Sequence, residues 1–363
     1  MESKSNTEKT DIFNLSKGEV FDGRYVIVKK IGSGGFGSVY EVFDNINKQT
    51  LAIKFVKSDE SRADLAIERF LVEKESFANL SINPYVIKLY DVFQEDKTWA
   101  IVTEIVSGGS LSEFNKRFFY MNQDEIKLFY TRVCSALSDA HKLNIIHRDI
   151  KEGNIMLTKF GSPKLGDFGI SYTEHSTDLT KDVKVGTPTH LDPQYFKWGA
   201  ISKQGDVYQL GICLYTSAVG EPPFWIHNSK WQGSKKATWY KLNQCRVNPV
   251  RPSLINPNVS IELENIILKA LDKNLSRRYK NMDDMQNDIQ NLGTNPNAKP
   301  FKSSTRWDKS EFFAEMKSYK KERNIIEVGV VNSSSMKSSF VFSLLAIFLV
   351  TILTFIIMVM IYV

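Results

Sequence analysis

The segment at residues 147–154 reads HRDIKEGN and concentrates groups that can act on a hydroxyl nucleophile and on phosphate. Asp149 offers a carboxylate that can accept the hydroxyl proton, and Lys151 offers a cation two residues later. Asn154 and Asp167, the latter in an Asp-Phe-Gly triplet, offer oxygen ligands for a hard divalent metal ion. A base, a cation and metal-binding oxygens together are what phosphoryl transfer requires.

A glycine-rich stretch, GSGGFGSV at residues 32–39, lies between two predicted strands. Glycines allow backbone N–H groups to approach phosphate oxygens without obstruction by side chains. A dinucleotide-binding loop is the alternative, but it requires a helix directly after the glycines, whereas residues 39–44 have the pattern of a strand. The order of elements therefore favours a phosphate-binding loop between two strands.

Lys54 ends the apolar strand LAIK at residues 51–54 and needs an anionic partner there. We expect that partner to be Glu73, which shares one face of a predicted helix at 63–80 with two phenylalanines. Glu68 and Glu75 are the alternatives.

The first part of the chain is rich in predicted strands and the second part in predicted helices, which indicates an α+β fold with a cleft between a small antiparallel β lobe and a larger helical lobe. The expected strands are 25–31, 38–44, 50–56, 89–93 and 98–104, interrupted by the helix at 63–80. The expected helices of the second part are 125–141, 206–219, 261–271 and 282–292.

The four motifs, in this order, resemble the eukaryotic-type (Hanks-type) serine/threonine protein kinase family over about residues 25–292. The resemblance implies the two-lobed protein kinase fold, with ATP and Mg²⁺ or Mn²⁺ in the cleft. It implies Asp149 as the catalytic base, Lys151 as its helper at the γ-phosphate, and Asn154 and Asp167 as the metal ligands.

The resemblance also implies an ATP site, in which Thr103 is the gatekeeper and residues 104–106 present hinge backbone to adenine. The implied ATP-site residues are Ile31, Gly32, Ser33, Gly34, Gly35, Phe36, Gly37, Ser38, Val39, Ala52, Lys54, Glu73, Thr103, Glu104, Val106 and Met156. Phe77, Leu89, His147 and Phe168 correspond to an apolar spine between the lobes, and Asp206 to the residue that braces the catalytic loop.

The acceptor class follows from the same resemblance. The lysine two residues after Asp149 and the Gly-Thr-Pro triplet at 186–188 resemble the pattern of serine/threonine kinases rather than that of tyrosine kinases. The implied substrates are therefore proteins with serine or threonine acceptors. A catalytically weak or inactive kinase-fold scaffold at a membrane is the alternative. The residues whose loss is typical of such scaffolds are all retained here.

Two further features concern the segment that binds the protein substrate. Where the family has Ala-Pro-Glu, residues 192–194 read DPQ, and Gln194 brings no charge to the expected partner Arg278, so we expect a weakened pair. Phosphorylation between Asp167 and this segment is expected to activate the enzyme through Arg148. The candidate sites are Thr180, Thr177 and Ser176.

We expect a disordered segment at 1–24 and a kinase domain at 25–292, with its small lobe at 25–105 and its large lobe at 106–292. A basic linker follows at 293–339, for which an amphipathic helix is one interpretation, and an apolar segment occupies 340–363. This last segment has 24 residues without a charged side chain, enough to cross a hydrocarbon core of ~30 Å. Basic residues precede it, so we expect a single-pass, C-terminal tail anchor in the lipid bilayer with the kinase domain in the cytosol.

The net charge of +6 is mild, and the chain has no compact basic stripe interleaved with aromatic residues, so nucleic acid is not an expected partner. The sequence indicates neither the oligomeric state nor which membrane is used.

Overall fold

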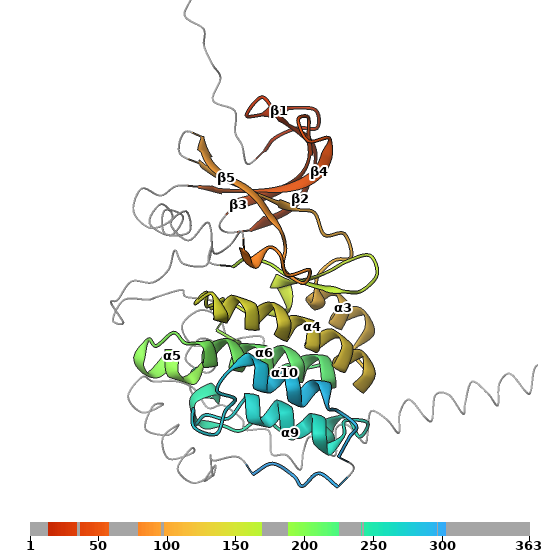
Figure 1. Ribbon diagram of the computed structural model, residues 1–363, viewed down its shortest axis with the longest axis vertical. Coiled ribbons are helices and arrows are strands. Elements are labelled where there is room, and N and C mark those ends of the chain that lie inside the picture. Colours follow the sequence, from red (N-terminus) through yellow and green to blue (C-terminus); the bar gives the residue numbers. More distant parts are fainter. Residues whose placement is uncertain are drawn as a thin grey trace, which may run out of the picture. The chain divides into compact units, whose positions relative to one another are not determined.

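The computed structural model describes residues 14–34, 37–57, 79–95, 98–168, 188–224, 241, 243–295 and 297–302. All of them belong to one compact unit that extends to Trp307. Within this unit a curled β sheet, coloured red to orange in Figure 1, is followed by a bundle of helices, coloured yellow to blue. This is the two-part arrangement that the sequence predicts.

The sheet of the small lobe has the strand order β1-β2-β3-β4-β6-β5, and every neighbouring pair is antiparallel. Its strands are β1 Val20–Phe21, β2 Tyr25–Gly34, β3 Gly37–Asp44, β4 Gln49–Lys57, β5 Leu89–Glu95 and β6 Thr98–Glu104. The last five correspond to the five expected strands, which are thus confirmed. The expected helix at 63–80 lies outside the described residues except for Asn79 and Leu80, which are helical.

Strand β1 corrects the expected start of the folded region at residue 25. Val20 and Phe21 pair with β2, and Phe21 is buried with its ring centroid 4.7 Å from that of Phe55. A strand of two residues has no periodicity by which the sequence alone could reveal it. The folded small lobe therefore includes residues that precede Tyr25.

Alternation along β3 builds the core of the small lobe. Buried and partly exposed side chains alternate from Gly37 to Asp44, as the two-residue period of a strand requires. Tyr40 and Val42 are thereby buried against Phe55 and Ala100. The opposite face of the same strand contributes Val39 to the cavity described below.

The helices of the large lobe surround α6, Lys203–Val219, which is buried along nearly its whole length. Around it lie α3 Leu111–Phe118, α4 Gln123–Lys142, α9 Ile261–Ala270 and α10 Met282–Gln290, with the short helices α5 Pro193–Trp198 and α8 Pro252–Ile255. The four helices expected at 125–141, 206–219, 261–271 and 282–292 are confirmed, with ends displaced by up to three residues. Ser202 is the N-cap of helix α6, because its side-chain Oγ accepts a hydrogen bond from Gly205 N.

A small hairpin between the lobes was not anticipated. It consists of β7 Ile155–Leu157 and β8 Pro163–Leu165, and the 3₁₀ turn η1 Glu152–Asn154 leads into it. Gly166 N donates to Asn154 O at 3.0 Å across the open end of the hairpin. The two ends of the hairpin thus bring the 147–154 segment next to Asp167.

The chain remains folded beyond residue 292, where the sequence analysis ends the kinase domain. Asn265 on α9 donates to Lys299 O at 2.8 Å and accepts from Phe301 N at 2.7 Å. Residues 297–302 therefore pack on the large lobe. None of the described helices is both long and apolar enough to span a bilayer. The rest of the predicted linker and the apolar segment at 340–363 lie outside the described residues.

Gly108 is a point of close backbone contact between the connection after β6 and the end of β7. Its N–H donates to Leu157 O at 2.8 Å, and an added Cβ would lie 2.3 Å from Thr158 O and 2.4 Å from Leu157 O. We expect Gly108→Ala to lower the free energy of unfolding by about 1–3 kcal/mol, as overpacking does. Urea unfolding measures this change. Gly153→Ala is the control, because its added Cβ would meet no atom within 4 Å, and it should lower the free energy of unfolding by less. Equal decreases in the two variants would contradict the prediction.

Candidate active site

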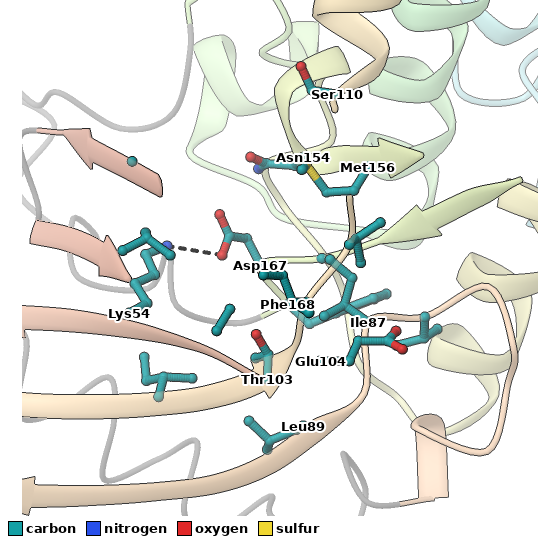
Figure 2. A pocket seen from close by; sticks show the side chains of 18 of the residues that line it. Lys54, Ile87, Leu89, Thr103, Glu104, Ser110, Asn154, Met156, Asp167 and Phe168 are labelled. Atoms are coloured by element: carbon teal, nitrogen blue, oxygen red, sulfur yellow. Dashed lines mark hydrogen bonds and ion pairs between the residues drawn. The ribbon is translucent and has the colours of Figure 1, made fainter. Parts of the chain in front are cut away.

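A cavity of about 440 Å³ lies between the β sheet and the β7–β8 region of the large lobe (Figure 2). Apolar side chains from β2, β3, β4 and β7 form two of its walls, and Lys54 and Asp167 lie at one end. Most of the ATP-site and metal-site residues implied by the sequence line it: Ile31, Gly32, Val39, Ala52, Lys54, Thr103, Glu104, Val106, Asn154, Met156 and Asp167.

Four other ATP-site residues are described but do not line the cavity. Ser33, Gly34, Gly37 and Ser38 lie at the end of the β2–β3 hairpin, where Ser33 pairs with Ser38 and Gly34 with Gly37. Gly35, Phe36 and Glu73 lie outside the described residues, as do the candidate phosphorylation sites Thr180, Thr177 and Ser176.

Ser110 and Glu113 line the cavity although the sequence analysis did not select them. They form a reciprocal cap at the start of α3: Ser110 Oγ accepts from Glu113 N at 3.2 Å, and Glu113 Oε2 accepts from Ser110 N at 2.8 Å. The spacing of a serine and a glutamate three residues apart is the sequence signature of such a capping box. That signature could have located this part of the wall.

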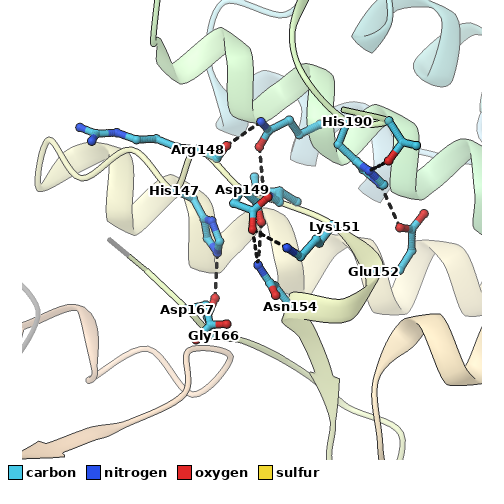
Figure 3. A network of polar contacts seen from close by, with 12 residues as sticks. His147, Arg148, Asp149, Lys151, Glu152, Asn154, Gly166, Asp167 and His190 are labelled. Atoms are coloured by element: carbon cyan, nitrogen blue, oxygen red, sulfur yellow. Dashed lines mark hydrogen bonds and ion pairs between the residues drawn. The ribbon is translucent and has the colours of Figure 1, made fainter. Parts of the chain in front are cut away.

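The carboxylate of Asp149 is held by its neighbours in the 147–154 loop (Figure 3). Lys151 Nζ contacts Asp149 Oδ2 at 2.6 Å, and Asn154 Nδ2 donates to the backbone oxygen of Asp149 at 2.8 Å and to Oδ2 at 3.2 Å. Burial by itself raises the pKa of Asp149, but the charge and hydrogen bond of Lys151 outweigh it, so that the pKa is lowered. The carboxylate is therefore ionised at neutral pH and can act as a base.

Helix α6 braces this loop from the large lobe. Asp206 accepts from His147 N and Arg148 N at 2.8 Å each, which confirms the expected position of this aspartate. Gln209, one turn later, accepts from Ile150 N at 2.8 Å and donates to Arg148 O at 2.8 Å. Arg148 has a φ of 72°, a left-handed conformation that non-glycine residues adopt only when the surroundings hold it.

Asp167 lies opposite Lys54 at the end of the cavity, with Lys54 Nζ 2.9 Å from Asp167 Oδ1. The expected partner of Lys54, Glu73, lies outside the described residues, so that ion pair stays a prediction. The next residue, Phe168, is buried, and its ring centroid lies 4.6 Å from that of His147. His147 Nε2 also lies 2.9 Å from Gly166 O, which orients the imidazole.

The spine that the sequence analysis expects is present in part. Leu89 and Phe168 line the cavity, and Phe168 contacts His147, whereas Phe77 lies outside the described residues. Leu89 on β5 also packs against the hydrophobic cluster that includes Phe168.

The oxygen atoms near Asp149 fit a divalent cation. Because Asn154 donates its amide nitrogen to Asp149, its side-chain oxygen is the atom left to face the cavity. Asp167 accepts from Lys54 with one carboxylate oxygen, which leaves its second oxygen for a metal ion. Figure 2 shows the side chains of Asn154 and Asp167 at the same end of the cavity. Amide and carboxylate oxygens are the ligands that Mg²⁺ and Mn²⁺ prefer.

The expected contact between Arg278 and Gln194 exists, and Gln194 brings no charge to it, but Arg278 has a second partner that does. Arg278 Nη2 donates to Gln194 Oε1 at 2.9 Å, while Nη1 contacts Asp192 Oδ1 at 3.0 Å. The side chain of Asp192 is 4% exposed and that of Arg278 is 0% exposed. The carboxylate therefore comes from Asp192, two residues before Gln194.

Comparisons with known proteins agree with this geometry. A family model described as "Protein kinase domain" matches residues 25–289. The chain is 33% identical to the serine/threonine-protein kinase PrkC of Bacillus subtilis over 274 residues, which are 75% of this chain and 41% of PrkC. It is 30% identical to the serine/threonine-protein kinase PknB of Mycobacterium leprae over 272 residues, 73% of this chain and 42% of PknB. The chain thus spans about two fifths of the length of these relatives.

Proposed function

This chain belongs to the protein kinase family, and from that premise we propose that it transfers the γ-phosphate of ATP to serine and threonine hydroxyls of proteins. The observation that carries the proposal is the Asp149 carboxylate, which Lys151 keeps ionised and which Asn154 contacts, while Asn154 and Asp167 both line the nucleotide-sized cavity. A base and a cation beside two metal-binding side chains of such a cavity suit the transfer of a phosphoryl group to a hydroxyl.

We assign the following roles. Asp149 orients the acceptor hydroxyl and accepts its proton, and Lys151 contacts the γ-phosphate. Lys54 binds the other phosphates. Asn154 and Asp167 would hold Mg²⁺ or Mn²⁺, which when bound supplies positive charge against the phosphate oxygens. The apolar walls around Val39 and Met156 would take the adenine, beside the hinge backbone at 104–106.

The serine/threonine class of acceptor rests on Lys151 and on the relatives, two of which are named serine/threonine-protein kinases. A kinase-fold scaffold without turnover is less favoured, because the described base, cation and metal-binding side chains are retained and brought together. Which proteins are phosphorylated is left to experiment.

The test is a transfer assay with the full chain, labelled ATP, Mg²⁺ or Mn²⁺ and a generic basic protein as acceptor. We expect phosphoserine and phosphothreonine in the hydrolysed product, and we expect EDTA to abolish the label because the metal is removed. Label on tyrosine would contradict the acceptor class. No label with either metal would contradict the catalytic proposal.

We also propose that phosphorylation of the segment after Asp167 activates the enzyme, with Thr180 as the first candidate site and Thr177 and Ser176 behind it. A phosphate would provide up to about −2 charge for Arg148. Mass spectrometry after incubation with ATP identifies the sites. Full activity of a variant with all three changed to alanine would contradict this switch.

We further propose that residues 340–363 span a bilayer as a C-terminal tail anchor, with the kinase domain on the cytosolic side. The support is the uncharged length of the segment and the basic residues that precede it, among them Lys317, Lys320 and Lys337. We expect the full chain to stay in membranes during carbonate extraction, and a chain truncated after Ser339 to be soluble with its transfer activity intact. Extraction of the full chain by carbonate would contradict the anchor.

A further inference from the structure

A buried carboxylate–imidazole contact connects two segments of the large lobe near the proposed base. Glu152 directly follows Lys151 in the catalytic loop, and His190 lies in the described stretch 188–192 that leads into α5. His190 Nε2 lies 2.9 Å from Glu152 Oε2, and the two side chains are 8% and 13% exposed. Figure 3 shows His190 reaching from its segment toward Glu152, beside the Asp149 cluster.

Both nitrogens of the His190 ring are engaged. Nδ1 lies 2.7 Å from Thr189 Oγ1, and because a hydroxyl can donate or accept, this contact suits either protonation state of the imidazole. On the other side of the ring, Nε2 faces the carboxylate of Glu152, and hydrogen bonds to carboxylates are shorter and stronger than hydrogen bonds to neutral acceptors.

The other contacts of this stretch lead elsewhere in the large lobe. Arg278 binds Asp192 and Gln194, and Gln244 Nε2 donates to Pro188 O at 2.7 Å. Those contacts fix one end of the stretch to the connection between α9 and α10 and the other end to Gln244. The contact between His190 and Glu152 fixes its middle to the catalytic loop itself, one residue from Lys151 and three from Asp149.

We propose that Glu152 and His190 are positioning residues for the protein acceptor, which hold the 188–192 stretch in register with the catalytic loop. The proposal rests on the proposed kinase function. The acceptor hydroxyl must reach Asp149 while its flanking peptide lies on the segment before α5. A misplacement of ~1 Å between reacting groups can cost ~100-fold in rate. A direct link between the two segments limits that misplacement.

Cys213 on α6 provides the competing interpretation. Its thiol and the side-chain donors of Glu152 and His190 all lie within 4.8 Å of one another. These are ligand types that Zn²⁺ accepts. A metal ion bound by these three side chains would compete with the direct contact between His190 Nε2 and Glu152 Oε2. The direct pair and a metal centre therefore make opposite predictions about metal content.

The test compares Glu152→Gln, His190→Gln and the double variant in the full chain. We expect each single change to lower kcat/KM for the protein acceptor by ~10-fold while the KM for ATP stays within ~2-fold, because the nucleotide cavity is formed by other residues. The kcat/KM of the double variant should be no lower than that of the less active single variant, because the two residues act through one contact. Lys142→Gln, which removes the exposed ion pairs of Lys142 with Asp139 and Asp283 in the same lobe, is the matched control.

A second measurement does not depend on turnover. Hydrogen–deuterium exchange of the amides at 188–192 should be faster in all three variants than in the wild type and unchanged in Lys142→Gln. The proposal would be overturned by unchanged exchange at 188–192 in the variants or by additive losses of kcat/KM in the double variant. It would also be overturned by a rise in the KM for ATP as large as the loss of kcat/KM for the protein acceptor. One equivalent of zinc in the purified wild-type protein, lost in the variants, would overturn the direct pair. A wild type without transfer activity would contradict the proposed function, and exchange would still decide this inference.

Discussion

Asp149→Asn is expected to lower the rate of phosphoryl transfer by about 10²–10⁴-fold, the usual contribution of a positioned general base. The asparagine keeps the size of the side chain, and Asn154 can still donate to the backbone oxygen of residue 149. What is lost is the ionised oxygen that now contacts Lys151 at 2.6 Å. The proton of the acceptor hydroxyl then has no carboxylate to receive it.

ATP binding should survive this change, because Asp149 is not among the residues that line the described cavity. The rate is measured with labelled ATP and the basic protein, and ATP affinity with a fluorescent ATP analogue. Asp124→Asn, an exposed aspartate in the first turn of α4, is the control and should retain the wild-type rate. A wild-type rate in Asp149→Asn, or a loss of ATP affinity as large as the loss of rate, would contradict the assignment of the base.

Asp192→Asn is expected to lower the free energy of unfolding by about 3–5 kcal/mol, the cost of removing one partner from a buried ion pair. The guanidinium of Arg278 is fully buried and cannot lose its charge. Burial raises the pKa of Asp192, and the charge and hydrogen bond of Arg278 oppose that shift. Removal of that carboxylate leaves the arginine charge without compensation.

A second change should repair this damage. Gln194 Oε1 already lies 2.9 Å from Arg278 Nη2, so Gln194→Glu places a new carboxylate against the same guanidinium. We expect Asp192→Asn combined with Gln194→Glu to recover more than half of the lost stability, measured by urea unfolding. Asp139→Asn, an aspartate with a 45% exposed side chain, is the control. The role of Asp192 would be contradicted if Asp192→Asn lowered the free energy of unfolding by no more than this control does. It would also be contradicted if the double variant were no more stable than Asp192→Asn alone.

The residues of the proposed chemistry could be recognised from the sequence because they lie in short motifs. Asp149, Lys151 and Asn154 fall within one loop of known spacing, and the structure brings their side chains into contact. The main strands and helices were also predictable, since alternation and helical periodicity are properties of consecutive residues. The helix that carries Asp206 was predicted from its pattern, whereas the bracing role of Asp206 followed from the resemblance to the kinase family.

The tertiary structure decided which distant residues meet. Asp192 lies 86 residues from Arg278, and the sequence alone does not show that the guanidinium meets this carboxylate as well as the amide of Gln194. Glu152 and His190 lie 38 residues apart in unrelated motifs, so neither residue indicates the other. Strand β1 and the return of residues 297–302 onto α9 likewise have no local signal. Such pairings depend on the path of the chain in space, and the spacing of neighbouring residues does not encode that path.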